Sequence, residues 1–285
     1  MTRLIPGLSA LADRYDVLLC DVWGVVHNGR ASFPAACAAL ARWRAERGPV
    51  VLISNSPRPA ESVIPQLDEL GVPRESWSTL VTSGDATRAL LAGRAPGPAW
   101  AIGPERDAPL YEGLGLRFAD PGTAAFISCT GPFDDEIETP EDYRARFEIA
   151  IARDLEMICA NPDLVVQRGE RLIYCGGALA ELYAAMGGRT LMAGKPHGPI
   201  YELALALGAQ LLDRPLARDR VLAIGDGLAT DVRGANVQGL DVLFIAGGIH
   251  GAEILGGAAL DAAAVARALG EQGLSAAYAM ADLVW

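Results

Sequence analysis

The sequence predicts an α/β protein: a Rossmann-like core built on a parallel sheet, interrupted by a second α/β domain. Short apolar stretches of strand length alternate with longer segments in helical spacing, which is typical of parallel sheets with crossover helices. The alternation is regular near the start of the chain and again from Thr190 onward, but less regular between. We therefore expect a discontinuous core, residues 1–84 and 189–285, around an inserted domain of residues 85–188.

The first strand is expected over residues 17–20, a short apolar run that ends on Asp21. Gly24 follows and allows the chain to turn sharply there. A helix is expected over 34–47, because Pro34 suits a first helical turn and Gly48 stands just past the end. The other elements expected in this part are a strand over 49–53, a helix ending at Leu70 and a strand over 80–82.

The middle of the chain contains one strong helix start, Thr139-Pro140-Glu141-Asp142. It combines an N-cap, a proline in the first position and acids beside the positive end of the helix dipole, so a helix is expected from there to about Asp154. The other elements expected here are a helix over 83–93 and strands over 99–103, 124–129 and 157–160. From Thr190 onward we expect strands over 190–193, 220–224 and 241–245, a helix over 199–207 closed by Gly208, and a helix that carries Asp231.

Composition and charge argue against several classes of protein. The chain of 285 residues has a formal net charge of −11, which argues against nucleic-acid partners because phosphates require a positive surface. No apolar run approaches the length of a membrane span, and the first residues lack the pattern of a signal peptide. The five cysteines are scattered without a C-x-x-C pair, which favours buried thiols over a zinc site or a disulfide framework. We therefore expect a cytoplasmic protein without a membrane partner.

Polar residues recur where strands are expected to end or helices to begin. They are Asp21, Ser54 with Asn55, Lys195 within Gly194-Lys195-Pro196, and Asp226 with Asp231. In a parallel sheet the carboxyl ends of the strands meet at one edge, which is where ligands bind. Carboxylates gathered there repel one another unless a cation lies among them, and their oxygens suit Mg²⁺. Lys195 and the hydroxyl of Ser54 would then bind the oxygens of an anionic substrate.

Each of these residues, taken alone, also has an ordinary structural explanation. The alternatives are a turn or cap residue (Asp21), a turn residue between glycines (Asp226), a helix cap (Ser54, Asn55), a surface turn (Lys195) and a solvated helix acid (Asp231). These explanations must account for the same kind of placement four times. The repetition favours a shared site.

The four short sites, in this order, resemble the four motifs of the haloacid dehalogenase-like (HAD) phosphatases. The insertion between the second and third resembles the large α/β cap of subfamily IIA, which contains nitrophenyl phosphatase and pyridoxal phosphate phosphatase. Asn161-Pro162-Asp163 and the run from Gly176 to His197 are also similar to that subfamily. The resemblance covers nearly the whole chain and implies a HAD-like core with a cap, residues 85–188, that selects the substrate.

The resemblance also implies a role for each motif residue. Asp21 would be the nucleophile and form an aspartyl-phosphate. Ser54 and Asn55 would bind the phosphoryl group, and Lys195 would neutralise charge on nucleophile and phosphate. The implied cofactor is Mg²⁺, and the residues implied for its site are Asp21, Asp226, Trp23 through its backbone carbonyl, and Asp231 in support of the metal or of Lys195.

The sequence departs from the family pattern at Trp23. The family has a second aspartate there, which serves as general acid and base, and an indole cannot deliver a proton to a leaving group. A positioned general acid typically contributes about 10²–10⁴-fold to a rate, so turnover of unactivated phosphate esters is expected to suffer. His27 is the one ionisable replacement close in sequence; the alternative is a loop histidine with no role in catalysis.

The sequence thus predicts a Mg²⁺-dependent phosphatase that acts on a small phosphorylated metabolite. The alternative is a non-catalytic protein that binds or senses a phosphorylated metabolite on the same fold, which Trp23 favours. A nicotinamide-dependent oxidoreductase does not fit, because no G-x-G-x-x-G follows the first strand. The sequence does not identify the substrate, and it leaves a homodimer open.

Overall fold

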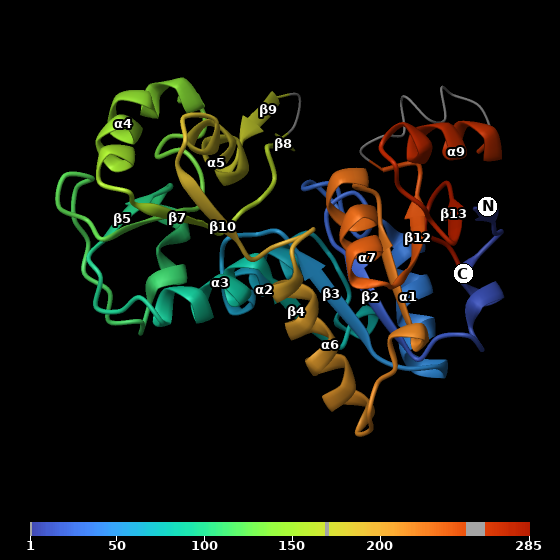
Figure 1. Ribbon diagram of the computed structural model, residues 1–285. Coiled ribbons are helices and arrows are strands. Elements are labelled where there is room, and N and C mark those ends of the chain that lie inside the picture. The colour runs from blue at the N-terminus through green and yellow to red at the C-terminus, as the bar shows by residue number, and fades with distance from the viewer. Residues whose placement is uncertain (1, 169–170, 249–259) are drawn as a thin grey trace. The chain divides into compact units, whose positions relative to one another are not determined.

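The structure is a computed structural model that describes residues 2–168, 171–248 and 260–285. The chain forms two compact units (Figure 1). The first comprises residues 1–54, 64–81 and 201–285, and the second comprises residues 55–63 and 82–200. The domain expected at 85–188 falls within the second unit. Each unit is built around its own parallel sheet.

The first unit contains a seven-stranded sheet in the order β1-β13-β12-β11-β2-β3-β4. The described pairings from β1 through to β3 are all parallel. The strands are β1 (Arg3–Leu4), β2 (Val17–Asp21), β3 (Val50–Ser54), β4 (Thr79–Thr82), β11 (Val221–Gly225), β12 (Asp241–Ile245) and β13 (Tyr278–Met280). This confirms the α/β class and the parallel core that the alternation of elements predicts.

The central strands are buried along their whole length, as their sequences suggest. Every residue of β2, β3 and β11 is buried, because a parallel sheet is covered on both faces and its strands are therefore apolar on both sides. Helix α1 (Pro34–Glu46) packs against β3, and α7 (Arg233–Gln238) packs against β12. The described residues outside the expected insertion contain three further helices, α2 (Ala60–Glu69), α6 (Gly198–Leu212) and α9 (Ala262–Glu271) (Figure 1).

Helix α6 corrects one prediction. The helix was expected to end at Leu207 with Gly208 as its stop, but it continues through Gly208 to Leu212. A Cβ on residue 208 would lie 3.2 Å from Cγ1 of Val17 and 3.3 Å from Cδ2 of Leu216. The glycine therefore permits close packing of the helix against β2, and this packing outweighs its weak helix propensity.

The second unit contains a four-stranded parallel sheet in the order β10-β7-β6-β5. Its strands are β5 (Ala99–Ile102), β6 (Phe126–Cys129), β7 (Glu156–Cys159) and β10 (Arg189–Met192). Side chains alternate between two apolar clusters, so that Phe126 and Ile158 join one and Ile127 and Met157 join the other. Both faces of this sheet are thus buried.

Three helices supply those clusters, and a hairpin completes the unit. Helices α4 (Arg144–Ala152) and α5 (Gly176–Ala185) cover one face, and α3 (Ser83–Ala92) contacts β7 on the other. Strands β8 (Val165–Arg168) and β9 (Arg171–Tyr174) form a separate antiparallel pair. The N-cap predicted at Thr139 is present and forms a capping box with Asp142, but the first turn is a 3₁₀ turn over Pro140–Tyr143, and α4 begins only after it.

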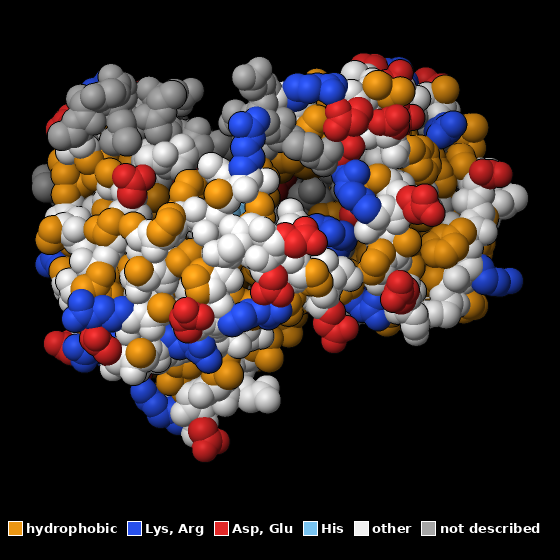
Figure 2. Space-filling view, turned by 180° about the vertical axis from the view of Figure 1, so that it is seen from behind, with side chains coloured by type: hydrophobic (Ala, Val, Ile, Leu, Met, Phe, Trp, Pro, Cys, Tyr) orange, Lys and Arg blue, Asp and Glu red, His pale blue; other side chains and the backbone are white. Residues whose placement is uncertain are grey.

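Two further expectations, for the cysteines and for membrane spans, can be compared with the described residues. All five cysteines are free and buried, as predicted. Among the described residues, no helix combines the length and the apolar character that crossing a membrane requires. On the face shown in Figure 2, Lys and Arg side chains are interspersed with Asp and Glu side chains, so the negative net charge is not gathered into one visible patch.

Candidate active site

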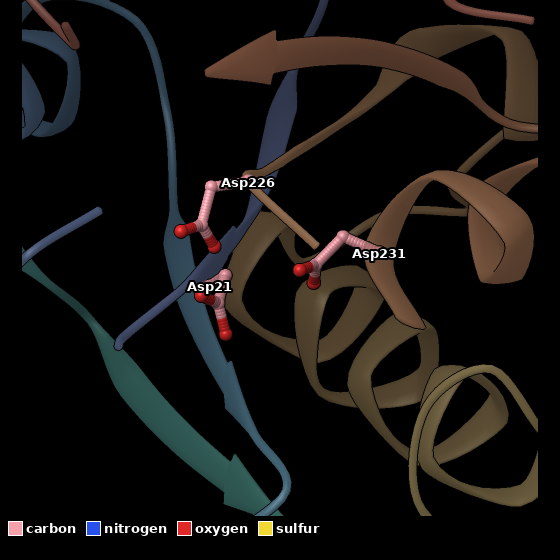
Figure 3. Close-up of side chains that lie close together, drawn as sticks. All are labelled: Asp21, Asp226 and Asp231. Carbon is pink, nitrogen blue, oxygen red and sulfur yellow. The ribbon is translucent and has the colours of Figure 1, made fainter. Parts of the chain in front are cut away.

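Three aspartates meet at the carboxyl edge of the sheet in the first unit. Asp21 is the last residue of β2, and Asp226 follows directly after the neighbouring strand β11. Asp231 comes from the helical turn Leu228–Val232. Their side chains are turned toward one another (Figure 3), and one carboxylate oxygen of each lies within 4.8 Å of those of the other two. The structure therefore brings together all three aspartates that the sequence singled out.

Glycines form part of the wall around these carboxylates. A Cβ on Gly24 would lie 2.0 Å from Oδ2 of Asp226, and one on Gly248 would lie 2.1 Å from the same atom. A Cβ on Gly225 would lie 2.2 Å from Cγ of Asp231. The acids are thus packed against main chain at positions where no larger residue fits.

The electrostatics of this cluster favour a bound cation. Asp21, Asp226 and Asp231 are only 5%, 4% and 5% exposed. Buried carboxylates this close together repel one another unless a positive charge lies among them. Because all the donors are carboxylate oxygens, the cluster suits a hard divalent ion such as Mg²⁺. The residues present therefore fit the cofactor that the sequence predicts.

Ser54 lies at the same edge of the same sheet. In the pairing of β2 with β3, Asp21 is opposite Ile53, so Ser54 stands one residue beyond that pair. Its side chain is buried. The prediction that Ser54 and Asp21 end neighbouring strands is confirmed.

Asn55 and Lys195 lie together in the second unit. The main-chain N–H of Lys195 donates to Oδ1 of Asn55 at 2.7 Å, and Nδ2 of Asn55 donates to the Lys195 carbonyl at 3.1 Å. Nδ2 also donates to Oδ1 of Asp163 at 2.8 Å. The structure thus forms two groups of predicted site residues, the aspartates with Ser54 in one unit and Asn55 with Lys195 in the other.

Trp23 sits on a tight loop that the chain forms directly after Asp21. The N–H of Gly24 donates to the carbonyl of His27 at 2.9 Å, and Gly24 adopts a φ of +81°. The indole lies over Gly29, whose Cβ would be 2.5 Å from it, and its ring meets that of His27 edge-on at 5.4 Å. Trp23 is 37% exposed. Packing within the loop therefore positions Trp23.

His27 has a structural part in this loop. Its Nδ1 accepts a hydrogen bond from the N–H of Gly29 at 3.0 Å, which leaves the proton of the neutral ring on Nε2. Burial lowers the pKa of His27 to about 4. The ring is therefore neutral near pH 7, and a neutral imidazole is a poor proton donor to a leaving group.

The structure adds two residues that had no assigned role. Asp163 contacts Asn55, and its only sequence signal is the Asn161-Pro162-Asp163 motif. Gly248 packs against Asp226. No local sequence pattern indicates this contact, because Gly248 follows β12 whereas Asp226 follows β11. Both depend on contacts between segments that are distant in sequence.

Comparison with known proteins identifies the family of this chain. The family model for haloacid dehalogenase-like hydrolases matches residues 18–117, and a second, HAD-hydrolase-like model matches residues 192–272. A D-glycerol 3-phosphate phosphatase from Mycobacterium tuberculosis is 31% identical over 255 residues, which are 86% of this chain and 67% of that protein.

Solved structures extend the comparison. A haloacid dehalogenase-like hydrolase from Brucella suis 1330 is 47% identical with a TM-score of 0.88, over 99% of this chain and 100% of that one. A glycerol phosphate phosphatase from Mycobacterium tuberculosis in complex with magnesium is 29% identical with a TM-score of 0.64, over 84% and 70% of the two chains. This chain therefore belongs to the haloacid dehalogenase-like hydrolases, and its relatives place it among the phosphatases of that family.

Proposed function

We propose that this protein is a Mg²⁺-dependent phosphatase that hydrolyses a small phosphorylated metabolite through a phosphorylated Asp21. The observation that carries the proposal is the convergence of three buried carboxylates within 4.8 Å at the end of β2 and β11. One of them, Asp21, is the last residue of β2 and stands in the first of the four sequence motifs.

The residues that would hold Mg²⁺ are Asp21, Asp226 and the backbone carbonyl of Trp23, with Asp231 in support. When bound, the ion supplies positive charge for the phosphoryl oxygens. The related phosphatase solved with magnesium supports this choice of metal. Calorimetry with Mg²⁺ alone tests it: Asp226→Asn is expected to lose most of the affinity, and equal affinity in both proteins would remove Asp226 from the site.

The chemical step follows from the groups of this chain. A carboxylate oxygen of Asp21 attacks phosphorus, a bond forms between them, and the bond from phosphorus to the ester oxygen breaks. The leaving oxygen departs with the electron pair of that bond and takes up a proton. Water then cleaves the aspartyl-phosphate, which releases inorganic phosphate and restores Asp21.

Other residues bind the phosphoryl group. Ser54 contributes its hydroxyl, and Lys195 contributes an ammonium that offsets the negative charge of nucleophile and phosphate. Asn55 contributes through its main-chain N–H, because the hydrogens of its side-chain amide are donated to Asp163 and Lys195. These roles rest on the order of the motifs together with the burial of Ser54, Asn55 and Lys195.

The substrate class is a small phosphate ester, and residues 85–188 act as the cap that selects it. D-glycerol 3-phosphate, named for the mycobacterial relative, is the first compound to test. Because Trp23 cannot donate a proton, we expect slow hydrolysis of alkyl esters of this kind, whose alkoxide needs a proton as it leaves.

The test of the mechanism is Asp21→Asn. We expect it to abolish phosphate release and to remove the phosphate that mass spectrometry finds on acid-quenched wild type during turnover. Asp16→Asn is the matched control, because Asp16 precedes the same strand at its opposite end, where Arg220 and Arg214 hold its carboxylate. Full activity of Asp21→Asn in a clean preparation would refute the mechanism.

A binding protein is the second candidate, and Trp23 in place of an acid is the observation that favours it. It predicts tight binding of one phosphorylated metabolite without turnover of any ester. Wild-type phosphate release that depends on Asp21 excludes it.

A further inference from the structure

The side-chain amide of Asn55 holds the main chain of Lys195 from both sides. It accepts from the Lys195 N–H at 2.7 Å and donates to the Lys195 carbonyl at 3.1 Å, although the two residues are 140 positions apart. Its second hydrogen goes to Oδ1 of Asp163 at 2.8 Å. We define these three residues and their contacts as the Asn55 clasp. All three belong to the second unit.

Asp163 and the Lys195 peptide group together determine which way the Asn55 amide faces. If the amide turned over, its oxygen would face the Asp163 carboxylate and the Lys195 carbonyl, and its NH₂ would face the Lys195 N–H. Each of these contacts would be repulsive, so the amide has one acceptable orientation. The N–H of Asp163 donates in turn to Oδ1 of Asn161 at 3.2 Å, which fixes the segment that carries the carboxylate.

The chain leading into Lys195 has no room to move against the clasp. A Cβ on Gly194 would lie 2.7 Å from Oδ1 of Asn55, 2.5 Å from Oγ of Ser83 and 2.8 Å from Cδ of Pro162. Asn55 and Lys195 are 5% and 3% exposed, so water cannot replace hydrogen bonds lost there. The clasp therefore sets the position of the Lys195 peptide group.

We propose that Asn55, oriented by Asp163, is a positioning residue for Lys195. This inference rests on the proposed function, in which the Lys195 ammonium offsets charge on the reacting phosphoryl group. The Asn55 clasp fixes the point at which the Lys195 side chain leaves the main chain. A buried cation acts on developing charge only from the correct place, and a misplacement of about 1 Å costs on the order of 10²-fold. Asn55 thereby links the phosphate-binding segment after β3 to the lysine after β10.

The experiment exchanges the two partners. Asn55→Asp sets a carboxylate against that of Asp163 and against the Lys195 carbonyl, and we expect kcat to fall about 10–100-fold with a smaller change in KM. In the double variant Asn55→Asp/Asp163→Asn, the amide at 163 donates to the carboxylate at 55, which still accepts from the Lys195 N–H. The net charge equals that of wild type, and we expect kcat to recover part of the loss, because the repulsion from residue 163 is removed while that from the Lys195 carbonyl remains.

Asn236 offers a matched control in the first unit. Its amide also holds a peptide group from both sides, donating to the Ser275 carbonyl at 2.8 Å and accepting from the Ser275 N–H at 2.9 Å. We expect Asn236→Asp to leave kcat within about twofold, because the residue it holds has no part in the proposed chemistry.

Hydrogen exchange at the Lys195 amide supplies a readout that needs no substrate or metal. We expect Asn55→Ala to speed this exchange, because it removes the acceptor. Faster exchange with unchanged kcat would overturn the positioning role, and so would a double variant no better than Asn55→Asp. If Asn55→Asp does not fold, Asn55→Ala decides, because it removes both hydrogen bonds to Lys195 without adding a charge; wild-type kcat there would overturn the inference. A wild type without turnover, or a Lys195→Met variant with full turnover, would instead refute the proposed function.

Discussion

Gly24 lies directly against the carboxylate of Asp226, so close that a Cβ on residue 24 would come within 2.0 Å of Oδ2. The contact joins the loop after β2 to the residue after β11, and it leaves the loop no freedom to accept a side chain. Gly24 also adopts a φ of +81°, which favours glycine. Two independent constraints thus require glycine at this position.

Gly24→Ala is therefore expected to displace Asp226 and to lower both Mg²⁺ affinity and turnover by at least about 100-fold. Gly71→Ala is the control, because Gly71 has a similar φ of +75° but only Ser32 Oγ near its Cβ, at 3.7 Å. That control is expected to cost about 1–2 kcal/mol of stability through backbone strain and to leave Mg²⁺ binding unchanged. Calorimetry measures the Mg²⁺ affinity of each variant, and thermal unfolding measures its stability. Wild-type Mg²⁺ affinity in Gly24→Ala would show that the loop can shift to accommodate a side chain without displacing Asp226.

Trp23 is expected to make the rate depend steeply on the leaving group. Nitrophenyl phosphate should be hydrolysed far faster than alkyl phosphates, because only its leaving group departs readily as an anion. Trp23→Asp is expected to flatten this dependence by restoring an acid worth up to about 10²–10⁴-fold on poor leaving groups. Rates with aryl phosphates of graded phenol acidity measure it, with Trp23→Phe as the control that keeps an aromatic ring over Gly29.

A flat series in the wild type would reveal another acid. His27→Gln then tests the nearest ionisable residue, because glutamine keeps an acceptor for the Gly29 N–H. We expect this variant to retain turnover within a few-fold, since His27 is neutral near pH 7.

Removal of residues 85–188 is expected to leave the core sheet folded. All seven strands of the sheet β1-β13-β12-β11-β2-β3-β4 lie outside this range, so a short linker in its place removes no strand of that sheet. Cooperative thermal unfolding followed by circular dichroism measures the outcome, and the remaining phosphatase activity should discriminate poorly between esters. An unfolded product would show that the core needs the inserted residues for stability.

Asp16 is expected to make stability depend on pH in the acid range. Hydrogen bonds from Arg220, and then from Arg214, lower the pKa of its carboxyl below the ordinary value of 3.8. The lowered value means that this stabilisation is fully present above the ordinary pKa and is lost as the pH falls through the folded-state pKa. Urea unfolding of wild type and Asp16→Asn should show a constant difference from neutral pH downward that shrinks in this acid range. A difference that does not shrink would contradict the role of the ionised carboxylate.

Much of the core could be predicted because its strands are buried on both faces. Such strands are continuous apolar runs, so the stretches ending at Asp21 and Ser54 were recognisable without any partner. Their carboxyl ends then placed Asp21, Ser54 and Asp226 at one edge of one sheet. The thiol state of the cysteines followed from their spacing, whereas the cytoplasmic location and the cap remain predictions.

Long-range contacts decided the rest. Strands β1 and β13 have two and three residues, too few for a periodic signal, and they form because β13 pairs with β12 and β1 pairs with β13. Gly208 reads as a helix stop, yet Val17, nearly two hundred residues away in sequence, makes it a packing contact inside α6. Asn55 reads as a helix cap or a phosphate ligand, but the direction of its amide depends on Asp163 and Lys195. The sequence alone determined which residues stand at the strand ends; which atoms those residues bind was decided only when distant segments came into contact, because hydrogen bonds and close packing act through space and leave no local pattern.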